Sequence, residues 1–151
     1  MLRLSKKLLF AIEAVLDIAY NASALPVQSG EITKRQGIPR RYLEQVLQQL
    51  VRAGILIGVR GPRGGYRLAR ERRRITVGEI VRVVRSLEQA DLAVEDAAGA
   101  ELGRRVVRPL WLELQADAMK RLDATTIEEL CTRAHQAGIA GEYAARYDYT
   151  I

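Results

Sequence analysis

The side chains best suited to chemistry lie close together in residues 60–67, which read Arg-Gly-Pro-Arg-Gly-Gly-Tyr-Arg. This segment places three arginines and an aromatic ring on a loop that its glycines keep slim. Arginine on such a tip is attracted to the negative potential of a narrowed minor groove. The segment therefore indicates a loop that contacts a polyanion, and its candidate contacts are Arg60, Arg63 and Tyr66.

The polar face of a predicted helix over residues 40–53 carries a second set of such side chains. Glutamine pairs with adenine edges, glutamate accepts from the cytosine amino group, and arginine donates to guanine or to phosphate. Because glutamate repels phosphate, its presence favours sequence reading over nonspecific binding. A solvated helix face with an incidental glutamate is the alternative. The candidate contacts are Arg40, Arg41, Tyr42, Glu44, Gln45 and Gln48.

Catalytic and nucleotide-binding patterns are weak in this sequence. Gly58, Gly61 and Gly64 recur every three residues, which fits neither glycine-rich nucleotide motif, and the loop leads into a strand rather than a helix. The sole histidine, His135, has no recognisable nucleophile or base context. We therefore expect no enzymatic activity and no cofactor.

Cys131 and His135 lie four residues apart on a predicted helix, so they share a face that would supply half of a metal site across a dimer. One cysteine cannot form an intramolecular disulfide or a multi-thiolate site within one chain. The commoner arrangement is a buried, inert cysteine beside a surface imidazole. We favour that arrangement and predict no metal site.

Length and composition are typical of a soluble globular protein. The chain has 151 residues, of which 48% are hydrophobic and 28% charged, which suits one domain or a small domain with a dimerisation arm. The longest charge-free stretch, residues 18–30, is too short and too polar to cross a membrane. Glu13 limits the N-terminal apolar run to residues 8–12, too short for a signal-peptide core. We expect a cytoplasmic protein.

Charge is distributed unevenly along the chain. Residues 1–88 contain 17 basic and 7 acidic side chains, a net charge of +10, whereas residues 89–151 contain 7 basic and 11 acidic ones, a net charge of −4. Lysine and arginine gain free energy when they displace counterions condensed on a polyanion, so nucleic acid is the leading candidate partner. A solvated arginine-rich face is the alternative.

The elements that position these side chains follow from apolar periodicity and from turn residues. Helices are predicted over residues 5–21, 31–36 and 40–53. Two short strands over residues 55–59 and 66–68 flank the glycine-rich loop. A short helix, a turn and a longer helix form a helix-turn-helix, and a hairpin directly after it is a wing.

The whole chain is predicted to be mainly α-helical, with the hairpin as its small β element. We expect a winged helix-turn-helix domain over residues 1–88 and an exposed linker or sensor loop over residues 89–105. Dimerisation helices over residues 106–138 and a C-terminal tail over residues 139–151 follow. Pro109 either opens the first of these helices or kinks it.

The long helix beyond the linker carries an apolar seam that must be covered. Leaving such surface in water forfeits about 25 cal/mol per Å² of apolar area. Because twofold homo-oligomers are common, a second copy of the chain is the simplest cover, and folding back onto its own domain is the alternative. We predict a symmetric homodimer through Val107, Leu110, Trp111, Leu114, Ala118 and Leu122.

Several motifs together resemble the Rrf-type family of bacterial winged-helix regulators. They are Leu-Arg-Leu-Ser at residues 2–5, Tyr-Leu-Glu-Gln at residues 42–45, and Arg-Gly-Pro-Arg-Gly-Gly-Tyr-Arg-Leu-Ala at residues 60–69. The resemblance spans most of the chain. It implies a dimeric DNA-binding repressor or dual regulator, with residues 42–45 in the major groove and the wing beside the minor groove. It also implies that the helix around Leu110 and Trp111 pairs the subunits.

The sequence departs from this family where the sensor is expected. Cluster-bearing relatives hold an iron–sulfur centre on three cysteines before the dimerisation helix, and the matching positions here are Ala93, Gly99 and Arg105. Arg108 occupies the position of the family's histidine ligand. The resemblance therefore implies the cluster-free branch, which responds to partner proteins, small ligands or thiol chemistry.

The prediction as a whole is a dimeric, sequence-specific DNA-binding transcriptional regulator, expected to be a repressor. Its operator should be an imperfect palindrome with half-sites about one helical turn, roughly 34–36 Å, apart. Three N-terminal residues complete the candidate DNA contacts: Arg3, Ser5 and Lys6. The alternative is a protein-interaction or RNA-binding module on the same scaffold, because fold does not fix function.

Overall fold

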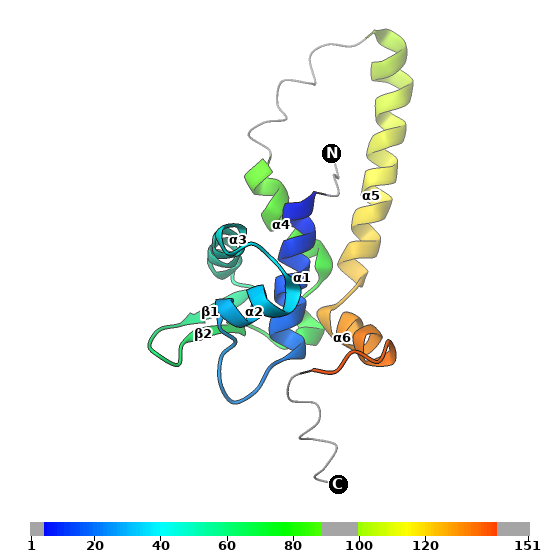
Figure 1. Ribbon diagram of the computed structural model, residues 1–151. Coiled ribbons are helices and arrows are strands. Elements are labelled where there is room, and N and C mark those ends of the chain that lie inside the picture. Colours follow the sequence, from blue (N-terminus) through cyan, green and yellow to red (C-terminus); the bar gives the residue numbers. More distant parts are fainter. Residues whose placement is uncertain (1–4, 89–99, 142–151) are drawn as a thin grey trace.

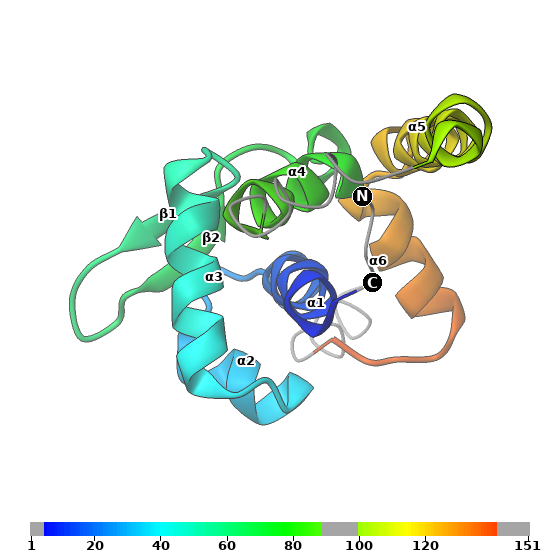
Figure 2. The same cartoon turned by 90° about the horizontal axis from the view of Figure 1, so that it is seen from above.

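A single helix, α1 (Lys6–Tyr20), lies in the middle of the computed structural model, with the other helices arranged around it (Figures 1 and 2). The structure describes residues 5–88 and 100–141. The further elements are α2 (Ser29–Gln36), α3 (Arg40–Arg52), β1 (Leu56–Val59), β2 (Gly65–Leu68), η1 (Arg72–Arg74), α4 (Val77–Glu88), η4 (Gly103–Val107), α5 (Arg108–Ala124) and α6 (Ile127–Gln136). The predicted mainly helical fold with a hairpin wing is confirmed.

α1 begins where the sequence predicts, because the Ser5 side chain accepts a hydrogen bond from the Leu8 N–H at 3.2 Å. Its Ala11 and Ala14 are fully buried, and such small side chains allow neighbouring elements to approach closely. α1 contacts α2, α3, α4, α6 and β2. The helix therefore forms the centre of one hydrophobic core.

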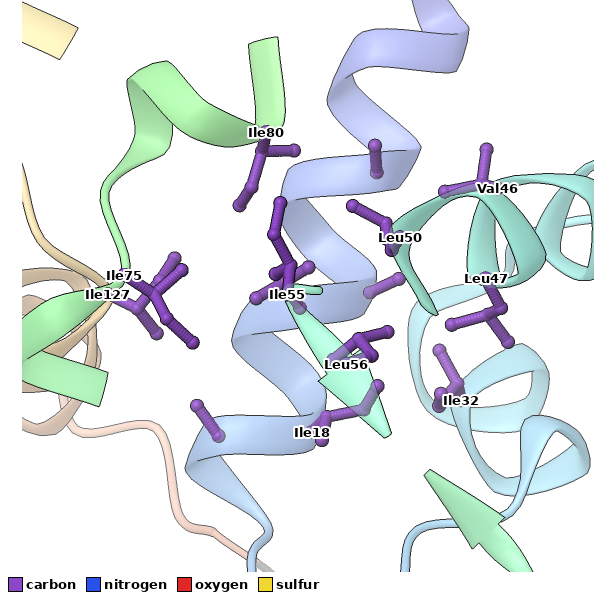
Figure 3. Close-up of a cluster of buried hydrophobic side chains, with 14 of the residues drawn as sticks. Ile18, Ile32, Val46, Leu47, Leu50, Ile55, Leu56, Ile75, Ile80 and Ile127 are labelled. Carbon is purple, nitrogen blue, oxygen red and sulfur yellow. The ribbon is translucent and has the colours of Figure 1, made fainter. Parts of the chain in front are cut away.

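The core extends from the helix-turn-helix to the last helix. In Figure 3, Ile32 and Leu47 lie at one end of the cluster, and Ile75 and Ile127 lie at the other. All four side chains are fully buried. Burying one aliphatic side chain of this size contributes about 1.5–3 kcal/mol, so the cluster holds α2, α3 and α6 to one framework.

The helix-turn-helix and the hairpin follow the predicted order with small shifts at their ends. α2 begins two residues before the predicted start, because the Gln28 N–H donates to Glu31 Oε2 at 3.1 Å in a capping box. Gly37 then ends α2 in the left-handed region, with φ +66°. β1 and β2 pair antiparallel, from Leu56 opposite Leu68 to Val59 opposite Gly65.

A short backbone junction joins the start of α4 to the end of α5. The Val77 N–H donates to the Thr125 carbonyl, and the Ile127 N–H donates to the Ile75 carbonyl, each at 2.9 Å. The Arg82 guanidinium forms two hydrogen bonds to the Asp123 carboxylate, at 2.7 and 2.6 Å. These backbone and side-chain hydrogen bonds therefore hold the C-terminal end of α5 against the winged domain.

The long helix begins earlier than the sequence predicts. The expected linker covers residues 89–105, but residues 101–107 are helical, and residues 89–99 lie outside the described residues. An ion pair between Arg105 and Glu101, 2.8 Å apart, stabilises this turn. The turn Gly103–Val107 is π-helical, and Pro109 follows in the first turn of α5. Pro109 therefore lies within the continuous helical stretch of residues 101–124, just after the π-helical turn.

Among the described residues, α5 packs on the core only through its C-terminal part, where Met119 and Leu122 are partly buried. Its N-terminal half stands away from the winged domain in Figure 1. The expected seam is 57% exposed at Val107, 55% at Leu110, 47% at Trp111 and 51% at Leu114. Contacts with the chain's own domain therefore cover the C-terminal part of α5. They leave the apolar surface of its N-terminal half exposed to solvent.

No helix within residues 5–88 and 100–141 combines the length and the apolar character needed to cross a membrane. Of the predicted C-terminal tail, the structure describes residues 139–141. There, Gly141 is buried beside Tyr20, whose hydroxyl donates to the Ile139 carbonyl. The segment after α6 therefore lies next to the C-terminal end of α1.

The Arg82–Asp123 pair predicts a pH-dependent contribution to stability. Hydrogen bonds from the Arg82 guanidinium lower the pKa of the Asp123 carboxyl. A carboxyl whose pKa falls on folding stabilises the protein above its unfolded pKa, about 3.9, and this contribution is lost as pH falls through the folded pKa. Because the pair is solvent-exposed, Asp123→Asn should lower the free energy of unfolding by less than about 1 kcal/mol at neutral pH.

Urea unfolding of the wild type and of Asp123→Asn would measure this difference across the pH range. The two free energies should converge as pH falls through the lowered folded pKa, because below it the carboxyl is protonated in both states. A difference of the same size at low and neutral pH would contradict an electrostatic origin.

Candidate nucleic-acid interface

The outward face of α3 is set by the residues that α3 buries. Leu43, Leu47 and Leu50 are fully buried, and Val46 is 2% exposed. The helical repeat turns the intervening side chains away from the core. The predicted contacts on this helix are all exposed: Arg40, Arg41, Tyr42, Glu44, Gln45 and Gln48.

The charged groups on this face differ in their partners. Arg40 Nε lies 3.1 Å from Glu44 Oε1, and both side chains are largely exposed. Arg41 has no ion pair or side-chain hydrogen bond among the described residues. The Tyr42 ring lies 6.4 Å from the Phe10 ring of α1, centroid to centroid, in a tilted arrangement. Tyr42 is thus packed on the central helix while its other side is open to solvent.

The hairpin tip presents Arg60 and Arg63 without acidic partners in the part of the chain that the structure describes. The backbone is tightly folded beneath them: a Cβ on Gly64 would lie 2.2 Å from the Val59 carbonyl oxygen. Gly61 has φ +111°, a conformation that favours glycine. These glycines therefore make the narrow tip that the sequence predicts.

The base of the wing is braced by the loop that precedes α2. Val27 and Tyr66 exchange two backbone hydrogen bonds, at 3.0 and 2.8 Å, which adds a bridge to the hairpin. The Arg67 guanidinium donates to the carbonyls of Ser23 and Ala24. Arg67 therefore points toward the loop before α2, although the sequence analysis groups it with Arg60 and Arg63 of the hairpin tip. Its acceptors are backbone carbonyls, which leave no signal in the sequence.

An open groove of about 710 Å³ lies between the first turn of α2, α3 and the wing. Its lining includes Ser29, Arg40, Arg60 and Tyr66. Figure 2 shows α2, α3 and the hairpin on one side of α1, and α6 on the other. The groove thus joins part of the two predicted contact segments, Arg40 of α3 with Arg60 and Tyr66 of the wing.

The remaining predicted contacts lie at the start of the chain. Lys6 is exposed in the first turn of α1. Ser5 caps that helix through its side chain, so it has a structural role in the free protein. Arg3 lies outside the described residues.

The Cys131 and His135 pair shows the arrangement that the sequence analysis favours. Cys131 is 4% exposed, and burial raises the pKa of its thiol, which keeps it protonated and unreactive at neutral pH. His135 is exposed. No group of three or more histidine, cysteine or acidic side chains within residues 5–88 and 100–141 is arranged to hold a metal ion.

Known proteins are similar to this chain in sequence and in fold. A family model named Rrf2, described as an iron-dependent transcriptional regulator, matches residues 4–133. The chain is 33% identical to the HTH-type transcriptional regulator IscR of Escherichia coli O1:K1 over 141 residues, which cover 93% of this chain and 86% of that protein. It superposes on T. potens IscR with a TM-score of 0.73 and 32% identity, covering 94% and 95% of the two chains. For CymR (YrzC), the global cysteine regulator of B. subtilis, the TM-score is 0.69 and the identity 31%, over 88% and 98%.

The helix-turn-helix followed by a braced hairpin defines a winged-helix protein. The chain belongs to the Rrf2 family of transcriptional regulators. Because these relatives are regulators and not enzymes, the prediction that the chain is not an enzyme is confirmed.

Gly65→Ala tests the brace of the wing. A Cβ at this position would lie 2.4 Å from the Val27 carbonyl oxygen and 2.7 Å from its carbon, so the backbone must separate. We expect the Val27–Tyr66 bridge to open and stability to fall by about 1–3 kcal/mol, the usual cost of overpacking. Hydrogen exchange of the Val27 and Tyr66 amides should accelerate.

Gly30→Ala is the matched control, because a Cβ there meets nothing within 4 Å and the residue is helical. It should leave amide exchange at the wing unchanged and alter stability by at most about 1 kcal/mol, in the favourable direction. Equal protection of the Tyr66 amide in both variants would contradict the expected opening of the Val27–Tyr66 bridge.

Proposed function

We propose that this chain is a homodimeric, sequence-specific DNA-binding regulator that represses transcription in the cytoplasm. The observation that carries the proposal is the groove shared by α3 and the wing. Exposed amide, carboxylate and guanidinium groups on α3 suit base edges, and the arginines of the tip suit phosphates or a narrow minor groove. Membership of a family of transcriptional regulators supports the same conclusion.

In this proposal α3 enters the major groove through residues 42–45, and the wing lies beside the adjacent minor groove. Glu44 accepts a hydrogen bond from a cytosine amino group, and Gln45 and Gln48 read base edges. Arg40 is paired with Glu44 in the free protein, so DNA binding exchanges that exposed pair for a phosphate contact. Breaking the Arg40–Glu44 pair requires little free energy, because exposed i,i+4 pairs contribute only about 0.3–0.5 kcal/mol to stability.

The exposed half of α5 supports the proposed dimer. Val107, Leu110, Trp111 and Leu114 leave a continuous apolar surface that a second copy of the helix would cover. Charge favours antiparallel pairing, since residues 101–112 carry three arginines and one glutamate, whereas residues 113–124 carry three acids and two bases. The antiparallel arrangement places these opposite net charges side by side and also opposes the helix dipoles.

The family description names iron, but the donor set of this chain does not fit a cysteine-held cluster. Cys131 is the one cysteine of the sequence, and it is buried with a raised thiol pKa. Arg105 and Arg108 lie on the helix where relatives carry ligands. We therefore propose a regulator without an iron–sulfur cluster, whose signal is a small molecule or a partner protein.

Two substitutions separate base reading from phosphate attraction once a duplex site has been selected from random sequence. Glu44→Ala should relax the preference at one base pair by about 1–3 kcal/mol with a smaller loss of affinity. Arg60→Ala should weaken binding to all sequences and reduce the slope of log affinity against log salt by about 1. Fluorescence anisotropy over a salt series measures both effects.

Arg133→Ala serves as the control, because this arginine pairs with Glu129 on α6, away from the groove. Its affinity and salt dependence should match those of the wild type. Unchanged binding by both Glu44→Ala and Arg60→Ala would refute the assigned roles. A selection that enriches no duplex, while a structured RNA or a protein binds tightly, would favour an interaction module instead.

Leu110→Glu tests the dimer seam. A charge at this position cannot be buried against a second helix without a large desolvation cost, so the variant should sediment as a monomer. Leu112→Glu is the matched control, since Leu112 is also exposed but lies about 200° around the helix from Leu110. Analytical ultracentrifugation should find Leu112→Glu still dimeric, and a dimeric Leu110→Glu would disprove the seam.

A further inference from the structure

A buried carboxylate lies in the last turn of α1, outside the groove. The Asp17 side chain has no solvent exposure, and its neighbours in the helix, Val15 and Ile18, belong to the core. Arg35 approaches with Nε 2.9 Å from one carboxylate oxygen and Nη2 2.8 Å from the other. Gln36 Nε2 lies 2.8 Å from Asp17 Oδ2. We call Asp17, Arg35 and Gln36 the Asp17 clasp.

The clasp is a principal attachment of α2 to the central helix. The one fully buried side chain of α2 is Ile32, so apolar packing alone leaves the rotation of this short helix weakly defined. A buried arginine–carboxylate pair adds little net stability over well-packed apolar residues, because desolvation opposes the attraction. Its bidentate geometry, however, permits only a narrow range of orientations. The clasp therefore fixes a position more than it adds stability.

By fixing α2, the clasp also fixes residues that line the groove. Gln36 ends α2, and the chain reaches Arg40, the first residue of α3, after the three residues 37–39. At its other end, α2 contributes Ser29 and Gly30 to the lining of the groove. A rotation of α2 about α1 would therefore move both a wall of the groove and the chain that enters α3.

We propose that Asp17 is a positioning residue for base recognition, which it controls through Arg35 and Gln36 without contacting DNA. This inference rests on the proposed function. Reading base edges requires side chains placed within about 0.5 Å, whereas attraction to phosphates tolerates larger shifts. Loss of the clasp should therefore reduce specific binding more than nonspecific binding.

The experiment compares the affinity of Asp17→Asn for the selected duplex with its affinity for a scrambled duplex of the same length. A variant that is only less stable has a smaller folded fraction, which lowers both apparent affinities by the same factor and leaves their ratio unchanged. A displaced α2 lowers the ratio. We expect the ratio to fall at least tenfold, with urea unfolding recorded in parallel.

Ile127→Ala is the stability control, because it opens a cavity at the end of the core opposite Ile32 (Figure 3). Its affinity ratio should equal that of the wild type. A wild-type ratio in a folded Asp17→Asn, or an equal fall in Ile127→Ala, would overturn the inference and leave the proposed function standing. A wild type that prefers no duplex would overturn both.

Two further variants keep the test decisive if Asp17→Asn does not fold. The double variant Asp17→Leu with Arg35→Met removes both charges together and should fold, but with a ratio at least tenfold lower. Gln36→Ala removes one of the three hydrogen bonds described above to the Asp17 carboxylate and should lower the ratio about threefold. Wild-type ratios in these two variants would show that apolar packing alone positions α2.

Discussion

Burial of α1 on several sides is the constraint on which the rest of this structure depends. The helix contacts α2, α3, α4, α6 and β2, so each of these elements must present an apolar face to it. For α3 this requirement turns Leu43, Leu47 and Leu50 inward. The opposite face of α3 then becomes a polar surface with a defined orientation, and the braced wing lies beside it. The candidate DNA surface is thus a consequence of how the core is packed.

The structure sorts the many arginines of the winged domain into two groups. Arg67, Arg70 and Arg82 bind carbonyl or carboxylate groups and hold elements together. Arg41, Arg60 and Arg63 have no such partner among the described residues and lie along α3 or at the wing tip. Three cations without an acidic partner among the described residues therefore lie on the candidate DNA surface. That placement is the electrostatic basis of the proposed function.

α5 has two environments along its length, and they correspond to two tasks. Its C-terminal part is joined to the winged domain by Asp123 and by backbone hydrogen bonds around Thr125. Its N-terminal half keeps apolar side chains in solvent, a cost of about 25 cal/mol per Å² that a second subunit would remove. In the proposed dimer, a rigid attachment at one end and an open seam at the other would let this helix set the spacing of the two winged domains.

The sequence by itself determined the order and type of the elements. Apolar periodicity located α1, α3 and α5, and the glycine-rich loop located the wing. These signals are local, because each depends on residues a few positions apart. The boundaries that moved depend on less common local features, such as the Gln28 cap and the π-helical turn before Pro109.

Tertiary structure alone decided which polar side chains have hydrogen-bond or ion-pair partners among the described residues. Asp17 and Arg35 are 18 residues apart, and Arg67 binds carbonyls more than 40 residues away. A charge among apolar residues of α1 signals a buried partner but not its identity. Close approaches such as Gly65 to Val27 also arise only when distant segments meet. The reason is that periodicity reports which face of an element is buried, whereas pairing of polar groups depends on how the elements pack together.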